Sequence, residues 1–168
     1  MAGSVIAILL NQFTEKDEAI FHAYVKNISL GIDENNFQVF DKIRKQKIPF
    51  AYEIKNIEND EDYFEPQISI QLEKTFGIKP VITIIFSAML HSNEDDLMLG
   101  EIALEFAKKA NGIICYLGLL NEENIINVKG EIQKIPFGIA DYREIFVHVS
   151  DTNFLQHWIN NKHFKLIK

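Results

Sequence analysis

The sequence predicts an α+β fold in a single globular domain, residues 1–168, with a mixed, mostly antiparallel sheet covered by about three to four helices. The first observation behind this prediction is size and composition: 168 residues, 47% apolar and 24% charged, are typical of one packed domain. The second is the succession of short apolar strands and amphipathic helices along the chain. The third is that some neighbouring strands are close enough in sequence to pair as hairpins.

The first strand and helix are predicted from an apolar run and a capping motif. Val5–Leu10 is continuously apolar, which indicates a buried strand. Thr14 followed by Asp17 resembles a capping box and places a helix over Glu15–Ile28. We expect this helix to bury Ile20, Tyr24 and Ile28, with Ala23 and Phe21 nearby, and to end by Gly31.

The next two strands are predicted to form an antiparallel hairpin. Asn36–Phe40 and Ile48–Ile54 read as strands, and the link between them is a turn or a single helical turn. That link contains the clearest basic cluster of the sequence, which consists of Lys42, Arg44, Lys45 and Lys47.

A loop over Asn56–Glu65 should separate this hairpin from a short helix. Pro66 is suited to the first turn of a helix, and apolar residues repeat at four-residue spacing up to the stop at Gly77 and Pro80. These apolar residues are Ile68, Leu72 and Phe76. The alternation of Ile68, Ile70 and Leu72 leaves a strand as the alternative, and the helix is preferred.

The middle of the chain predicts a strand–helix–strand unit. Val81–Met89 is apolar on both faces and is expected to be a central strand. A helix over Asp95–Ala110 follows, and Asn111-Gly112 ends it before a strand over Ile113–Leu117. Its expected apolar face consists of Leu97, Ile102, Leu104 (or Ala103), Phe106 and Ala110. If the two strands are parallel, the connection should be right-handed.

The last third of the chain contains one weak segment and one clear strand–helix pair. Ile125–Ile135, with Gly130 and Pro136 nearby, indicates an edge strand or a loop. Glu144–Val149 is predicted to be a strand. A final helix over Thr152–Asn160, capped by Ser150 or Asp151, should bury its apolar residues Phe154, Leu155, Trp158 and Ile159. The tail His163–Lys168 can add a last short strand.

Composition also narrows the classes of function. A single cysteine excludes an internal disulfide framework and a cysteine-based zinc site. The longest nearly apolar run, Val81–Leu90, is about half of the roughly 20 residues that a membrane helix needs. Because the N-terminus also lacks the features of a signal peptide, we expect a cytoplasmic protein with no membrane partner. The net charge of −7 and the absence of a long basic stripe argue against nucleic-acid binding.

Catalytic motifs are not found in the sequence. GxGxxG, GxxxxGK[ST], GxSxG and HExxH are all absent. Cys115 lies in an apolar strand, which favours a buried, unreactive thiol. We therefore predict no catalytic residue, no cofactor and no metal site.

The charge is concentrated in one third of the chain. Residues 56–106 contain eleven acids and two bases and carry −9, whereas the rest carries +2. Within this third, the acidic segment surrounds two adjacent aromatic residues with five carboxylates. It consists of Glu58, Asn59, Asp60, Glu61, Asp62, Tyr63, Phe64 and Glu65. Apolar anchors inside a charged rim are typical of a protein-binding surface for a basic partner. The alternative is that the two rings fold inward and attach the loop to the core.

A second candidate is the polar stretch between the central strand and the helix that follows. His91 is followed by Ser92 and by the candidate residues Asn93, Glu94, Asp95 and Asp96. A histidine beside carboxylates can hold a metal or transfer protons. The structural alternative is favoured, because acids in the first turn of a helix interact well with its dipole, and Asn93 or Glu94 can serve that end.

Several stretches together resemble a known class of proteins. They are His91 with the helix Leu97-Met98-Leu99-Gly100-Glu101-Ile102-Ala103-Leu104-Glu105-Phe106-Ala107, Asn111-Gly112, Leu117-Gly118 and the tail from Phe154-Leu155-Gln156-His157-Trp158 to Lys168. This pattern, with Met1-Ala2-Gly3 leading into a strand, resembles small bacterial immunity proteins that are encoded beside polymorphic toxins. The resemblance implies a cytosolic protein that binds and blocks a cognate toxin, and it implies no catalytic residues.

The expected function is therefore neutralisation of a toxin with a basic surface, by stoichiometric binding through the acidic segment. Two other functions remain open. One is a small hydrolase-like enzyme that uses His91 with Asp95 or Asp96, with or without a divalent metal. The other is a regulatory domain, which would need a sizeable apolar pocket with a few convergent polar groups.

Overall fold

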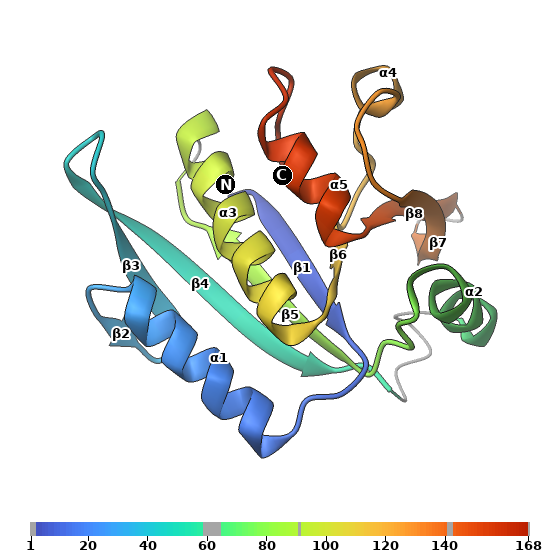
Figure 1. Ribbon diagram of the computed structural model, residues 1–168, viewed down its shortest axis with the longest axis horizontal. Helices are drawn as coiled ribbons and strands as arrows, with labels where there is room; N and C mark the ends of the chain where they lie inside the picture. Colours follow the sequence, from blue (N-terminus) through green and yellow to red (C-terminus); the bar gives the residue numbers. More distant parts are fainter. Residues whose placement is uncertain (1–2, 59–64, 91, 141–142, 168) are drawn as a thin grey trace.

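The computed structural model describes residues 3–58, 65–90, 92–140 and 143–167. Within these residues the chain forms an eight-stranded sheet in the order β2-β3-β4-β5-β1-β6-β8-β7 (Figure 1). The strands are β1 (Val5–Leu10), β2 (Ile32–Asp33), β3 (Asn36–Asp41), β4 (Gln46–Asn56), β5 (Ile82–Ala88), β6 (Ile113–Cys115), β7 (Ile132–Ala140) and β8 (Arg143–Ser150). The helices are α1 (Glu15–Ile28), α2 (Pro66–Phe76), α3 (Asn93–Ala110), α4 (Glu122–Ile125) and α5 (Thr152–Ile159).

The expected α+β fold is confirmed, with two differences in detail. Each pair of neighbouring strands is antiparallel, so the described part of the sheet is not mixed. The described residues form five helices rather than three or four, because α4 adds a single turn of four residues. No helix in the described ranges is both long and apolar enough to cross a membrane.

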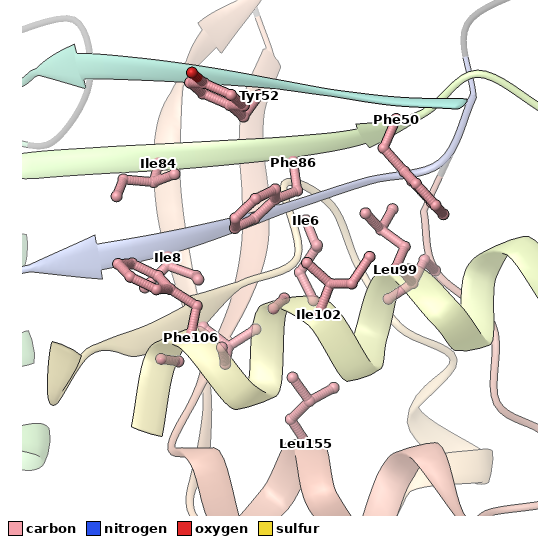
Figure 2. Packing of buried hydrophobic residues seen from close by; sticks show 14 of the residues in the cluster. Ile6, Ile8, Phe50, Tyr52, Ile84, Phe86, Leu99, Ile102, Phe106 and Leu155 are labelled. Atoms are coloured by element: carbon pink, nitrogen blue, oxygen red, sulfur yellow. The ribbon is translucent and has the colours of Figure 1, made fainter. Parts of the chain in front are cut away.

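Helices α1, α3 and α5 cover one face of the sheet, which we call the first face (Figure 1). Alternate residues of the central strands point into this layer, as expected for pleated strands with a period of two. Figure 2 shows how side chains from β1, β4 and β5 meet those of α3 and α5. The labelled members are Ile6, Ile8, Phe50, Tyr52, Ile84, Phe86, Leu99, Ile102, Phe106 and Leu155.

Helix α2 packs on the opposite face, which we call the second face. Ile68 and Leu72 of α2 form a separate buried cluster with residues of β1, β6, β7 and β8. The β3–β4 part of the second face is more open, since Asn36, Gln38 and Glu53 are exposed there. The second face is therefore covered at the β6–β8–β7 side and open toward β3.

The N-terminal predictions are largely confirmed. Strand β1 and helix α1 have the expected bounds, and the capping box forms, with the Thr14 side chain accepting from the Asp17 amide. The interior side of α1 differs from the prediction: Phe21, Tyr24 and Val25 are buried, whereas Ile20 is 41% exposed and Ile28 only partly buried. The cause is a rotation of the helix that gives the central positions to the aromatic rings of Phe21 and Tyr24.

The hairpin and helix α2 are also confirmed. The Lys/Arg-rich link is a turn, and both strands extend beyond their predicted ends, to Asp41 and to Gln46–Asn56. Pro66 stands in the first turn of α2, and Gly77 closes it with φ 71°, so the helix prediction holds over the strand alternative. The two-residue strand β2 was not predicted.

Strand β1, which comes earlier in the sequence, lies between the two strands of the predicted strand–helix–strand unit. Strand β5 is central, between β4 and β1, as expected. Strands β5 and β6 run parallel to one another, since each is antiparallel to β1, which lies between them. Helix α3 begins two residues earlier than predicted and buries Ile102, Ala103 and Phe106. Leu97 is 37% exposed, because at about 3.6 residues per turn it lies on the opposite side of the helix from Phe106.

The weak segment before the last strand contains both predicted alternatives, a loop and the start of an edge strand, at bounds other than those expected. Ile125 ends helix α4, and β7 begins only at Ile132 and continues to Ala140 as the edge strand. A bulge between Pro136 and Ile139 interrupts its pairing with β8, as expected for proline at a sheet edge. Asp151, not Ser150, caps α5, and its carboxylate accepts from the Phe154 amide.

The C-terminal tail contributes a single bridge rather than a strand. The Val5 amide donates to the Ile167 carbonyl at 3.0 Å, and these two residues form an isolated antiparallel bridge. Phe164 lies against Trp158, and a Cβ on Gly100 would come within 2.9 Å of the Phe164 ring. The tail therefore joins the start of β1 to helices α3 and α5.

Candidate functional site

The acidic segment Glu58–Glu65 lies between β4 and α2. Its two ends, Glu58 and Glu65, are exposed. The predicted site residues Asp60, Glu61, Asp62, Tyr63 and Phe64 lie outside the described residues.

Buried residues hold the chain on both sides of the acidic segment. Before it, Ile57 is buried in the cluster under α2, and its amide donates to the Val81 carbonyl at 2.8 Å. The Asn56 side chain also accepts from the Glu58 amide at 3.0 Å. After it, Ile68 is buried in the same cluster. The segment is therefore attached at both ends to one packed layer.

The acids that surround this segment in the sequence do not form one surface. Helix α2, which follows the segment, packs on the second face, whereas α3 packs on the first (Figure 1). Glu94, Glu101 and Glu105 are exposed on α3 and so lie across the sheet from α2. The described acids of residues 56–106 are thus divided between two sides of the molecule.

The described side chains of the second candidate loop make mainly structural contacts. Asn93 and Glu94 are exposed, and His91 lies outside the described residues. Neither Asn93 nor Glu94 is the N-cap of α3; Ser92 fills that position and forms a capping box with Asp95. The Asp95 carboxylate accepts from the Ser92 amide at 3.0 Å, and the Ser92 hydroxyl accepts from the Asp95 amide at 3.1 Å.

Arg44 connects this capping box to the β3–β4 turn. Its guanidinium donates to Asp95 at 2.6 Å, to Ser92 at 3.0 Å and to Asp41. The Asp41 carboxylate also accepts from the amides of Ile43 at 2.8 Å and of Arg44 at 3.0 Å. These bonds to Arg44 lower the pKa of Asp41, and Asp95 together with Asp41 raises the pKa of Arg44. We call Asp41, Arg44, Ser92 and Asp95 together the Arg44 brace.

Asp96 is also buried, at 3% exposure, and faces the C-terminal tail. One of its carboxylate oxygens accepts from the Leu166 amide at 3.3 Å, and the other has no hydrogen-bond partner among the described residues. Asp95 and Asp96 thus both attach distant segments to the first turn of α3. In the part of the chain that the structure describes, no group of three His, Cys, Asp or Glu residues could hold a metal ion.

A groove on the β2–β3 side was not predicted from the sequence. It has a volume of about 500 Å³ and is lined by apolar side chains next to a few polar ones. The residues that line the groove include Leu30, Ile32, Asp33, Asn36, Pro49 and Met89. Sequence reasoning missed it because β2, which forms part of its wall, has only two residues.

Comparison with known proteins identifies a family but no function. The sequence matches the family of unknown function DUF6368 over residues 2–168, which is nearly its whole length. The chain therefore belongs to this family. No curated protein and no solved structure matches it.

Proposed function

We propose that this member of the DUF6368 family is a cytoplasmic immunity protein that neutralises a cognate toxin by stoichiometric binding. The toxin would present a basic surface, and the acidic segment Glu58–Glu65 would occupy it. The observation that supports this proposal most directly is the position of the segment: five carboxylates and no base stand between two buried anchors, Ile57 and Ile68.

Anchoring of this kind favours binding. A loop whose ends are fixed has less conformational freedom to lose when a partner orders it, so more of the interaction energy remains as affinity. Carboxylates on such a loop also accelerate encounter with a cationic surface, and apolar rings placed among them slow dissociation. Tyr63 and Phe64 have the residue types that dominate the centres of protein interfaces.

The chemistry of the partner follows from the charge. A toxin that acts on nucleic acid needs cationic side chains to hold phosphates. Carboxylates can occupy the same side chains, which would keep the nucleic acid out of the toxin's active site. A nuclease-like or other nucleic-acid-modifying toxin is therefore the first partner to examine.

The electrostatic part of the proposal can be tested with two triple variants of equal charge. Asp60→Asn/Glu61→Gln/Asp62→Asn neutralises the acidic segment, and Glu94→Gln/Glu101→Gln/Glu105→Gln neutralises the exposed acids of α3. The partner is the product of the adjacent gene, and binding is followed by surface plasmon resonance at several salt concentrations. We expect the first variant to reduce the association rate about tenfold at low salt and to flatten its salt dependence. The second variant should change the association rate and its salt dependence much less.

Equal effects of both variants would mean that only net charge matters, and no effect of either would contradict the use of the acidic segment. The rings are tested in the same assay. Tyr63→Ala or Phe64→Ala should raise the dissociation rate with little change in association. A variant that fails to fold would instead place its ring in the core.

The enzyme alternative is less well supported by the geometry. Both carboxylate oxygens of Asp95 already accept structural bonds, from Arg44 and from the Ser92 amide. Asp96 keeps one oxygen without a partner among the described residues, but it is only 3% exposed, and its other oxygen accepts from the Leu166 amide. Calorimetric titration with Mg²⁺, Mn²⁺ and Zn²⁺ distinguishes the two. Tight, stoichiometric binding that is lost in His91→Ala would favour an enzyme.

A further inference from the structure

The tip of the β3–β4 hairpin exposes an isoleucine to solvent. Ile43 is 93% exposed, the highest value among the large apolar side chains of the described residues. The hairpin extends beyond the helices at the upper left of Figure 1. Three lysines around it, Lys42, Lys45 and Lys47, are also exposed, and no ion pair is found for them among the described residues. An apolar residue in a cationic setting is the composition of an interface centre with a charged rim.

The Arg44 brace holds this tip in one conformation. Asp41 fixes the amides of Ile43 and Arg44, and Arg44 reaches across to Ser92 and Asp95 at the start of α3. The tip is therefore pre-organised, which lowers the entropy cost of inserting Ile43 into a partner. A pocket of defined shape benefits from such rigidity.

The groove on the β2–β3 side has complementary properties. Leu30, Ile32 and Met89 are exposed apolar residues of its wall. Asp33 lines the groove and Glu34 adjoins it in the β2–β3 turn; both are exposed, and neither has an ion pair among the described residues. The groove thus offers apolar walls and negative charge, where the tip offers an apolar residue and positive charge.

We infer that these two features bind one another between copies of this chain, so that Ile43 of each copy enters the groove of the other in a two-fold dimer. Within one copy the strands of the hairpin keep the tip away from the groove, so the tip can only enter the groove of a second molecule. The lysines of the tip would then face Asp33 and Glu34 of the second copy.

The edge of β3 does not offer strand pairing at the groove. Gln38 exchanges backbone hydrogen bonds with Leu30 and Gly31, and Phe37 pairs with Ile32, so residues 30–32 of the same chain occupy this edge. Ile43 lies in the turn after β3, which ends at Asp41. The second copy would therefore meet the groove with the side chains of its turn, through Ile43 and the lysines around it.

The test is sedimentation velocity of the whole protein over a wide concentration range. We expect a concentration-dependent dimer in the wild type. Ile43→Ser should raise its dissociation constant at least about tenfold, as for a residue at the centre of an interface. The matched control is Ile126→Ser, which removes an equally apolar side chain that is 79% exposed in the segment after α4 and should leave the dimer intact. At a concentration where the wild type is monomeric, both variants should keep its melting temperature, because neither residue is in the core.

Charge reversal provides an independent arm. Lys42→Glu/Lys45→Glu should weaken the dimer, and adding Asp33→Lys/Glu34→Lys to the same chain should restore it. The inference is overturned if the wild type stays monomeric at all concentrations, if Ile126→Ser acts as strongly as Ile43→Ser, or if the double reversal does not restore association. Binding of monomeric wild type to anionic lipid vesicles, lost in Ile43→Ser, would also overturn it and assign the tip to a membrane surface.

Discussion

At the scale of single residues, His148 shows how one side chain can fix a loop. Its ring nitrogen Nδ1 accepts from the Leu120 amide at 2.9 Å, and its backbone exchanges bonds with Tyr116 and Gly118. Leu117, between them, has φ 54° and occupies the left-handed region that residues other than glycine rarely adopt. The side chain and backbone of His148 together hold this unfavourable turn in place.

The pH dependence of this contact gives a prediction. Burial lowers the pKa of His148 below its usual value of 6.5; the nearby Lys134 lowers it further, and Glu122 opposes both. Because the unfolded chain takes up the proton at a higher pH than the folded one, the stabilisation is complete above about pH 6.5 and declines as pH falls below it. We expect the free energy of unfolding to fall by at most about 1.4 kcal/mol per pH unit from this group.

Urea unfolding between pH 7 and pH 5 measures this slope. His148→Asn keeps an acceptor for the Leu120 amide but does not titrate, so it should be the less pH-sensitive protein. His157→Asn, at an exposed position of α5, serves as the control and should keep the wild-type slope. If both variants keep the wild-type slope, groups other than His148 cause the acid sensitivity.

At the scale of elements, the same capping motif occurs once in an exposed and once in a buried setting. Thr14 and Asp17 cap α1 at the surface, and Ser92 and Asp95 cap α3 where Asp95 is only 1% exposed. The second motif also holds Arg44 and, through it, the β3–β4 hairpin. The two capping boxes have the same chemistry but should therefore contribute unequally to the free energy of unfolding.

Alanine substitution tests this inequality. Asp17→Ala removes a surface cap and should lower the free energy of unfolding by about 1 kcal/mol. Asp95→Ala removes a cap and also one partner of the partly buried Arg44, and should lower it by about 3 kcal/mol. Thermal or urea unfolding of both variants measures the difference; similar losses would show that Arg44 contributes nothing through Asp95.

Elements with a strong local pattern could be predicted, and those defined by distant contacts could not. Val5–Leu10 and Glu15–Ile28 have a continuous apolar run and a capping box, and both have the predicted bounds. Strand β2 is two residues long, and β7 contains Pro136 and a bulge, so neither has a clear apolar alternation. Their extended conformation depends on β3 and β8, which supply the hydrogen bonds.

The candidate sites follow the same rule. The acidic segment is contiguous, so composition alone could identify it. The role of Asp95 depends on Arg44, 51 residues away, and that of Asp96 on Leu166, 70 residues away. The groove joins residues near positions 30, 49 and 89, which no short motif brings together.

At the scale of the whole molecule, the C-terminal tail ties the first face together. Phe164 contacts Trp158, Leu166 donates to Asp96, and Ile167 bridges Val5. A Cβ on Gly118 would lie 2.7 Å from the Ile167 side chain, so the tail also fits closely against the loop after β6. The tail thus links the sheet to α3 and α5.

Removal of this tail should destabilise the entire domain. Termination after Lys162 exposes apolar surface on α3 and α5 and leaves the buried Asp96 carboxylate without its donor. We expect a loss of about 4 kcal/mol, the sum of lost apolar burial and an unsatisfied polar group. The control, Lys165→Ala, alters an exposed side chain of the tail and should be close to neutral. Comparable stability of the truncated protein would contradict this role.

Strand β4 is 11 residues long and spans about 36 Å, with the hairpin tip before it and the acidic segment after it. Ile57 before the acidic segment and Ile68 after it are buried in the same packed layer, so the scaffold fixes both ends of the segment. Under the proposed function, relatives with the same scaffold would diverge in the toxin they bind by changing this segment, as antibodies do with their hypervariable loops. Transplanting this stretch from one relative to another should then transfer the choice of toxin along with it.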